Sequence, residues 1–358
     1  MNIIFKSHKE KAVSFLNSIR DKKGIFICTV AHTETSSIPG ISAAGASTDM
    51  IKFTPAADVE AIYYGKVKCT DTIPKNPVGP PSPVIITIAA LEFLQIPFLC
   101  LNAGVKVTPE VPFVDIGSSY GESIETGKAL YKHNIENILE KTKIFAKEIA
   151  KSYDFIVLGE SVPGGTTTAM ALINALGFNA SNRISGSMPG NQHELKNKVV
   201  SKALSYINSN DSIWDIVKKI CDPMQPVQAA FAIEAAKNGC KVILAGGTQM
   251  LSVGVLISKI DDSGDVKKNI LIATTKWVTE DNFSNINELI KELNLPYPFI
   301  SANLDFTNSK HKNLQLYEEG YVKEGVGAGG LATIVFNNVG IDNQTFLDKI
   351  EEVYEKIF

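Results

Sequence analysis

The sequence has very little arginine and lacks the cysteine and histidine patterns that hold metals. Among its 358 residues only Arg20 and Arg183 are arginines, so a phosphate site would depend on lysine, hydroxyl groups and backbone N–H groups. The five cysteines include no C-x-x-C pair, and the five histidines are scattered. We therefore expect no metal site and no bound cofactor.

A basic surface charge and a long apolar run are also missing. The net charge of −3 argues against a nucleic acid as partner, because binding a polyanion needs a basic face. The longest apolar stretch, residues 84–105, is interrupted by polar residues and a proline, so it predicts a helix and then a buried strand, not a membrane span. The first residues lack the apolar core of a signal peptide, and three cysteines lie within or beside apolar runs. We expect a cytoplasmic protein with no membrane partner.

Short apolar runs alternate with helical patterns along most of the chain. Several of the runs are apolar without alternation, which is typical of strands covered on both faces. This order predicts an α/β fold with a mainly parallel, doubly wound (Rossmann-like) sheet, whose ligands bind beyond the carboxyl ends of the strands. The candidate strands begin at Gly24, Ala61, Pro97, Asp154, Lys241, Ile270 and Pro298.

The helical patterns suggest how the chain is divided. One runs from the 120s to Ser152, another ends at Gly239, and the two ends of the chain are also helical, with Asp342 or Asn343 as the cap of the last helix. We predict an α/β domain over residues 21–338. Residues 1–20 and 339–358 would form a small helical satellite domain or contribute to a dimer contact. The proline-rich segment 72–84 is interpreted as an ordered loop or lid, or equally as a passive surface loop.

The segment LGESVPGGTTTA, which starts at Leu158, is the clearest local signal. A buried strand is expected to end at Leu158, and a helix to begin at the threonines. Gly164 and Gly165 permit close backbone approach, and Thr166 and Thr167 would add hydroxyls to the free N–H groups of the helix start. The pattern predicts an anion cradle, with a simple helix cap as the alternative. Glu160 would face a ribose hydroxyl or a base N–H, or would instead interact with the helix dipole.

Three further segments place small residues after expected strands or before helices. Glu324 precedes a run that begins at Gly325, which suggests a flat ligand close to backbone, although a flexible turn before an apolar helix would give the same pattern. Gly247 lies in another glycine turn between a strand and a helix. Gly186 lies in a loop before a helix in which Lys196 and Lys198 come early, where either lysine would meet a phosphate or simply solvent.

In this order, the segments resemble the nicotinate-nucleotide:dimethylbenzimidazole phosphoribosyltransferase family of cobalamin lower-ligand synthesis. GESVPGGTTTA, from Gly159, is similar to the family's G-E-M-G-I-G-N-T-T-T-A, and EGVGAGG, from Glu324, is similar to its E-G-[TS]-G-A-A. The V-D-I-G at Val114 and the D-P helix start at Asp222 also match its layout. The resemblance extends from about Thr29 to Phe336, and the two main motifs in this order are fairly specific.

The resemblance implies a role for individual residues. It makes Glu324 the general base that takes the proton of the attacking base, and it places Glu160 near the substrates. It puts the phosphate-contacting lysine at Lys198 and places Ser42, in GISAAGA, beside the base pocket. It also implies a homodimer that uses nicotinate mononucleotide and a benzimidazole-like base.

The sequence departs from the family pattern near the expected base pocket. Ala43 stands where the family has tyrosine, Gly165 stands where it has asparagine, and the family's K-P-x-G-S-L-G segment has only a faint parallel at Lys75. The acceptor therefore stays open among dimethylbenzimidazole, a hydroxybenzimidazole and adenine.

Two other classes of function also fit a glycine–threonine cradle. A kinase would need acidic Mg²⁺ ligands, for which Asp261, Asp262 and Asp265 are the nearest cluster, although DDSGD is typical of a solvated turn. A non-catalytic regulator would bind nicotinate mononucleotide without transferring its ribose phosphate.

Overall fold

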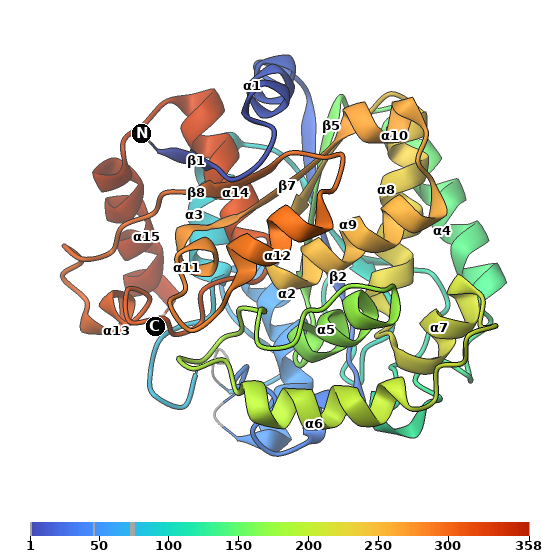
Figure 1. Ribbon diagram of the computed structural model, residues 1–358. Helices are drawn as coiled ribbons and strands as arrows, with labels where there is room; N and C mark the ends of the chain where they lie inside the picture. Colours follow the sequence, from blue (N-terminus) through green and yellow to red (C-terminus); the bar gives the residue numbers. More distant parts are fainter. Residues whose placement is uncertain (1, 46, 72–75, 358) are drawn as a thin grey trace.

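The strands of the computed structural model, which describes residues 2–45, 47–71 and 76–357, form an eight-stranded sheet with the order β1-β8-β7-β6-β5-β2-β3-β4 (Figure 1). Neighbouring strands are parallel, except that β1 pairs antiparallel with β8. The predicted doubly wound α/β fold is confirmed. The strands are β1 (Ile3–Phe5), β2 (Gly24–Val30), β3 (Phe98–Asn102), β4 (Phe113–Asp115), β5 (Phe155–Ser161), β6 (Lys241–Ala245), β7 (Ile270–Thr275) and β8 (Phe299–Ala302).

Helices cover both faces of the sheet (Figure 1). Short 3₁₀ turns at 34–37, 48–53 and 124–126 and a π-helical turn at 335–339 complete the regular structure of the described residues. The α-helices are α1 (Lys9–Ser18), α2 (Thr54–Tyr64), α3 (Val84–Leu94), α4 (Ile135–Ala150), α5 (Gly165–Ala175), α6 (His193–Leu204), α7 (Ile213–Ile220), α8 (Met224–Lys237), α9 (Thr248–Ile260), α10 (Gly264–Asn269), α11 (Lys276–Thr279), α12 (Ile286–Leu293), α13 (Lys312–Gln315), α14 (Ala328–Ile334) and α15 (Asn343–Ile357).

The strand side chains divide the core into two apolar clusters. Ile25 and Ile27 belong to a cluster with α4, α5, α8 and α9, whereas Phe26 and Cys28 belong to one with α1, α3, α14 and α15. This division follows from the period of two in a strand, which sends successive side chains to opposite faces. The terminal helices α1 and α15 thus share an apolar cluster with the sheet, and residues 3–5 add a strand to it.

Most of the strands predicted from apolar runs are present, but one is not. Residues 61–64, predicted to be part of a strand, form the last turn of α2, and Gly65 follows in the left-handed conformation with φ 66°. That prediction was wrong because aromatic residues such as Tyr63 and Tyr64 favour strands only when a sheet packs against them. The three-residue strands β1 and β4 were not predicted.

The helix boundaries were predicted with mixed success. The helix expected from the 120s begins only at Ile135, where the Asn134 side chain accepts a hydrogen bond from Asn137 N–H. Gly239 follows α8 with φ 84°, as expected for a residue just beyond a helix end. Asp342 caps α15 by accepting from Thr345 N–H at 2.8 Å.

The strand order places a switch point between β2 and β5. From β2 the chain moves outward to β3 and β4, and from β5 it moves the opposite way through β6 and β7 to β8. The connections that leave β2 and β5 therefore diverge, which opens a crevice beyond their carboxyl ends.

Candidate active site

A cavity lies beyond the carboxyl ends of the strands, and the empty space inside it and in its open mouth together is about 920 Å³. Its wall comes from several parts of the chain that are far apart in sequence: segments within residues 41–58, 76–83, 160–166, 185–187, 247–249 and 322–326, together with Val278. Residues 72–75 of the proline-rich segment lie outside the described residues, whereas Asn76, Ser82 and Pro83 line the cavity.

Nine of the eleven residues predicted for the site line this cavity, and Thr167 and Lys198 do not. Thr167 is buried inside α5, and Lys198 is exposed on α6. The residues that meet at the cavity are Ser42, Glu160, Gly164, Gly165, Thr166, Gly186, Gly247, Glu324 and Gly325.

Four hydrogen bonds hold the Glu324 carboxylate. Oε2 accepts from the Thr274 hydroxyl at 2.7 Å and from Thr275 N–H at 2.9 Å, while Oε1 accepts from Gly325 N–H at 3.1 Å and Gly329 N–H at 3.0 Å. Burial raises the pKa of the Glu324 carboxyl, and these four donors oppose the increase because they favour the charged form. Glu324 thus joins the end of β7 to the start of α14.

The backbone around Glu324 is strained. Val322, Lys323 and Val326 have positive φ values of 64°, 58° and 56°, which non-glycine residues rarely adopt. Lys323 N–H and Glu324 N–H each bond to the carbonyl two residues earlier, at 2.7 Å, which makes two consecutive γ-turns of the uncommon positive-φ form. Such conformations cost about 1–3 kcal/mol each and persist only where the surroundings enforce them.

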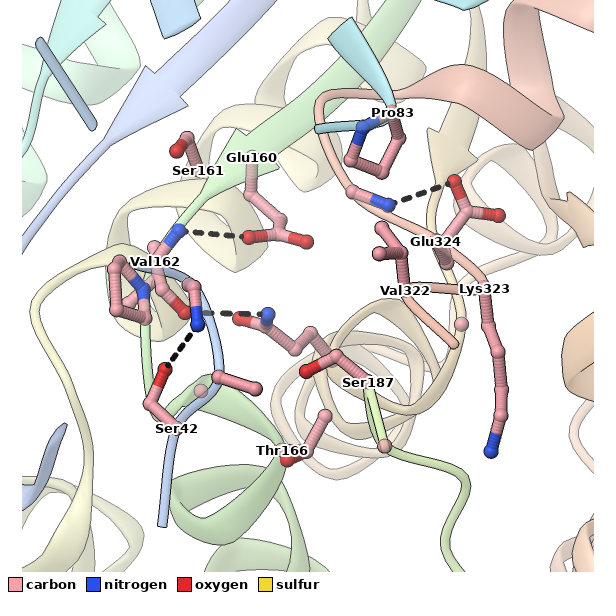
Figure 2. Close-up of a pocket in the computed structure, with 18 of the residues that line it drawn as sticks. Ser42, Pro83, Glu160, Ser161, Val162, Thr166, Ser187, Val322, Lys323 and Glu324 are labelled. Atoms are coloured by element: carbon pink, nitrogen blue, oxygen red, sulfur yellow. Dashed lines mark hydrogen bonds between the residues drawn. The ribbon is translucent and has the colours of Figure 1, made fainter. Parts of the chain in front are cut away.

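Glu160 faces the same cavity with fewer partners. Its Oε2 accepts from Val162 N–H at 3.0 Å (Figure 2). Burial raises the pKa of the Glu160 carboxyl well above its usual range, and the nearby Glu324 charge adds to the increase. The strand expected to end at Leu158 in fact continues to Ser161, so Glu160 is fixed by the sheet itself. In Figure 2 it enters from β5, opposite the loop that carries Glu324.

The two glycines of the predicted cradle are needed for different reasons. Gly164 has φ 79°, and a Cβ there would lie 3.0 Å from Ser36 Cα. Gly165 is not in the positive-φ region, but a Cβ there would overlap the side-chain amide of Gln249. Both allow the start of α5 to face the cavity, where Thr166 lies at its wall.

The lysine nearest the cradle is Lys196, not the predicted Lys198. Lys196 is buried on α6, and its Nζ donates to Thr166 Oγ1 at 3.0 Å. A Cβ on Gly186 would lie 2.6 Å from this Nζ, so the ammonium is next to two residues of the cavity wall. Burial, reinforced by the Lys323 charge, lowers the pKa of Lys196 to about 7. The motif resemblance implies Lys198 as the phosphate lysine, but Lys198 lies two positions after Lys196 on α6.

A second buried lysine next to the cavity is already paired. Lys323 Nζ donates to Asp281 Oδ2 at 2.7 Å, to Asn191 Oδ1 at 2.9 Å and to Met188 O at 3.4 Å, which uses all three of its N–H groups. Both members of the Lys323–Asp281 ion pair have side chains only 2% exposed. Of these two lysines, Lys196 is therefore the one with N–H groups that no described residue accepts.

Asp58 is a third carboxyl group at the cavity wall, which the sequence did not reveal. It accepts from the Ser82 hydroxyl at 2.8 Å and from the Ser161 hydroxyl at 2.7 Å. Burial raises its pKa to about 6 even though both serines favour the charged form. A single aspartate within a helical segment gives no sequence signal for such a role.

Neither a metal cluster nor a membrane helix is found among the residues that the structure describes. No group of three or more His, Cys, Asp or Glu side chains in that part of the chain is arranged to hold a metal ion. In the same ranges, no helix combines the length and the apolar character needed to cross a bilayer.

The chain has close relatives over nearly its whole length. The UPF0284 protein of Sulfurisphaera tokodaii is 41% identical over 337 residues, which are 94% of each chain. Those of Archaeoglobus fulgidus and Sulfolobus acidocaldarius are each 39% identical and cover 94% and 96% of this chain and 94% and 100% of their own. The chain belongs to the UPF0284 family.

Other matches connect this UPF0284 protein to phosphoribosyltransferases. A phosphoribosyltransferase family model matches residues 94–260, which include Glu160 and the glycine–threonine loop but end before Glu324. Crystal structures of nicotinate-nucleotide-dimethylbenzimidazole phosphoribosyltransferase and of CobT, both from Thermus thermophilus, superpose with TM-scores of 0.60 and 0.56. They are 13% and 14% identical, and the matches cover 96% and 89% of this chain and 87% and 86% of theirs.

The motif resemblance is confirmed by these matches. At 13–14% identity the solved structures show a shared fold, and the family model adds the phosphoribosyltransferase connection in sequence. Together they support a transferase of the phosphoribosyltransferase type.

The buried ammonium of Lys196 should make the stability of the ligand-free UPF0284 protein depend on pH. The folded-state pKa of about 7 lies below the unfolded value of about 10.4, so the unfolded chain binds more protons between these values. The free energy of unfolding should therefore rise with pH through this window. We expect Lys196→Met to stabilise the free protein at about pH 6, and its advantage to shrink by about 1–3 kcal/mol by about pH 9.

Urea unfolding of the wild type and of Lys196→Met at the two pH values measures this difference. Lys198→Met, which changes an exposed lysine two residues away, is the control. An advantage of Lys196→Met that is the same at both pH values would show that Lys196 keeps its ordinary pKa.

Proposed function

We propose that this protein transfers the phosphoribosyl group of nicotinate mononucleotide to a benzimidazole-like base during assembly of the cobamide nucleotide loop. The products would be nicotinate and an α-riboside phosphate. The observation that carries the proposal is that one cavity has a cationic end and an acidic end: Lys196 lies behind one wall, and Glu324 and Glu160 line another.

The cationic end suits the 5′-phosphate. Thr166, Gly186 and Ser187 line it, and α5 starts there with its partial positive charge. Among the described residues, the Thr166 hydroxyl is the hydrogen-bond partner of Lys196, so an ammonium beside a phosphate could replace lost hydration with charge-assisted hydrogen bonds. Holding the phosphate there would fix the ribose ring relative to Glu324.

The acidic end suits the attacking base. One ring nitrogen of the base would form the new bond to ribose C1′, while the bond from C1′ to the pyridinium nitrogen breaks and leaves its electron pair on nicotinate. The other ring nitrogen loses its proton, which Glu324 would accept as general base. Attack opposite the leaving group converts the β-riboside to an α-riboside. Because the leaving pyridinium becomes neutral, no general acid is required.

Thr274 makes this proton transfer compatible with the four hydrogen bonds around Glu324. Three of the donors are backbone N–H groups, which cannot turn away. The fourth is the Thr274 hydroxyl, which can rotate and free one lone pair of Oε2 for the incoming proton. Glu160, whose raised pKa favours the protonated form, would meanwhile donate a hydrogen bond to a ribose hydroxyl or to the base.

The kinase alternative receives no support from the site. Asp261, Asp262 and Asp265 follow the end of α9, whereas the cavity meets the beginning of that helix. A helix of 13 residues separates the two places by about 20 Å. The acidic residues are therefore too far away to hold a metal ion at the cavity.

Transfer itself is the direct test. The protein is incubated with nicotinate mononucleotide and, separately, with dimethylbenzimidazole, a hydroxybenzimidazole or adenine, without added metal. We expect nicotinate and an α-riboside phosphate in equal amounts with at least one base, detected by chromatography. Binding of the mononucleotide without any release of nicotinate would favour a non-catalytic regulator.

Glu324→Gln should lower kcat by about two to four decades, because the amide cannot accept the proton. The amide also places an NH₂ group against two of the four donors, so the variant should lose about 1–3 kcal/mol of stability. Turnover is therefore measured at a temperature where circular dichroism shows the variant to be folded. Turnover at the wild-type rate would remove Glu324 from the mechanism.

Lys196→Met and Lys198→Met should separate the two candidate phosphate lysines. We expect Lys196→Met to raise KM for nicotinate mononucleotide by about 10- to 100-fold, which corresponds to one charge-assisted hydrogen bond of about 1.5–3 kcal/mol. Lys198→Met should change KM by less than about twofold, since the exposed side chain lies outside the cavity wall. A larger rise in KM for Lys198→Met than for Lys196→Met would support Lys198 as the phosphate lysine, as the motif resemblance implies.

A further inference from the structure

The strained loop that carries Glu324 needs anchors, and several of them lie in one neighbouring segment. Val322 N–H donates to Ser187 O at 2.9 Å, and Lys323 Nζ donates to Met188 O and to Asn191 Oδ1. All three acceptors belong to residues 185–191, which we call the phosphate-side loop. The conformation of the Glu324 loop therefore depends on where the phosphate-side loop lies.

The Lys323–Asp281 ion pair ties these parts together. Besides pairing with Lys323, Asp281 Oδ2 accepts from the Ser185 hydroxyl at 2.6 Å and from Asn191 Nδ2 at 2.8 Å. Asn191 Oδ1 in turn accepts from Gly186 N–H at 2.7 Å. A single buried network thus joins both ends of the phosphate-side loop to the residue immediately before Glu324.

The same loop forms part of the proposed phosphate end. Ser185, Gly186 and Ser187 line the cavity, and the position of a Cβ on Gly186 is 2.6 Å from Lys196 Nζ. An anion bound there would contact the loop that anchors Lys323. The route from that anion to Glu324 is short and passes only through hydrogen bonds already described.

We propose that the Lys323–Asp281 ion pair is a positioning device, which couples occupancy of the phosphate end to the placement of the Glu324 carboxylate. Neither residue needs to touch the reacting atoms. Stability alone gives little reason for such a pair, because buried ion pairs can often be replaced by apolar groups without loss of stability. An ion pair that holds a strained catalytic loop in place, in contrast, has a function that an apolar replacement would not provide. The inference rests on the proposed transfer reaction.

A comparison of two donors tests the coupling. Nicotinate mononucleotide carries the 5′-phosphate, and nicotinate riboside lacks it. For the wild type, the phosphate should raise kcat as well as lower KM. Lys323→Met should lower kcat for the mononucleotide by about 10- to 100-fold, as expected for a misplaced catalytic group. Its kcat for the riboside should fall much less, so the phosphate advantage in kcat disappears.

Two further variants make the result specific. Asp281→Asn breaks the same ion pair but removes no side-chain volume, and it should show the same loss of phosphate advantage. Lys276→Met removes a mostly buried lysine at the same edge of the sheet, whose ion-pair partners are Glu318 at 3.1 Å and Asp305 at 3.9 Å and not residues of the buried Lys323–Asp281 network. This variant should keep the phosphate advantage in kcat.

Equal losses of kcat for both donors in Lys323→Met and Asp281→Asn would overturn the proposal, because that pattern indicates only general damage. A rise in KM alone would do the same, since it indicates direct phosphate contact.

Hydrogen exchange tests the coupling without turnover. Ribose 5-phosphate should slow amide exchange of the peptide containing residues 321–330 in the wild type and in Lys276→Met, but not in Lys323→Met. If the wild type transfers no ribose phosphate to any base yet shows this protection, the proposed reaction fails and the coupling stands. If ribose 5-phosphate binds the wild type and leaves this peptide unprotected, the coupling is wrong whatever the reaction.

Discussion

The Glu324 carboxylate accepts hydrogen bonds from two places in the chain, the end of β7 and the start of α14, and its charge adds to the effect of burial in raising the pKa of Glu160 beside it. Four donors favour the ionised form, while burial opposes it. Glu160, with Val162 N–H as its donor, is buried beside that charge, so the proton is held more readily by Glu160. Two like charges in one buried space do not ionise together. One carboxyl group that is ionised beside one that is protonated is therefore the arrangement that an acid–base site needs.

The sheet makes this arrangement possible. β2 and β5 are neighbours whose connections leave in opposite directions, and the opening between them receives the loop before α14. Close approach matters here: a Cβ on Gly159 would lie 2.9 Å from Gly327 backbone atoms, so β5 and the Glu324 loop meet at a spacing that excludes side chains. Val326 N–H bonds to Glu160 O at 2.8 Å at the same contact. Thus a backbone hydrogen bond directly joins the two segments that carry Glu160 and Glu324.

Local patterns in the sequence predicted the parts of the structure that depend on local rules. Strands buried on both faces are continuous apolar runs, so β2, β3 and β5 to β8 were recognisable, whereas the three-residue β1 and β4 are too short for any period to show. The glycine motifs likewise indicated which backbone segments lie at the cavity wall. The motif resemblance did not single out Lys196. Two positions along a helix rotate a side chain by about 200°, so Lys198, to which the motif corresponds, lies on the opposite face of α6. Asp58 and Asp281 carry no motif, and only tertiary packing brings Asp58 to the cavity wall and Asp281 to Lys323 beside it.

The site is built at a cost to the stability of the free protein. Lys196 and Lys323 are both buried, and among the described residues around them Asp281 is the carboxylate that pairs with Lys323, so the ammonium form of Lys196 is left without a carboxylate of its own. The residues at positive φ beside Glu324 add backbone strain. Neither feature improves folding. In the proposed reaction an anion would neutralise the lysine, and the strained loop would place the Glu324 carboxylate. Excess buried charge and backbone strain beside one cavity are thus better explained by the proposed phosphorylated ligand than by the packing of the fold.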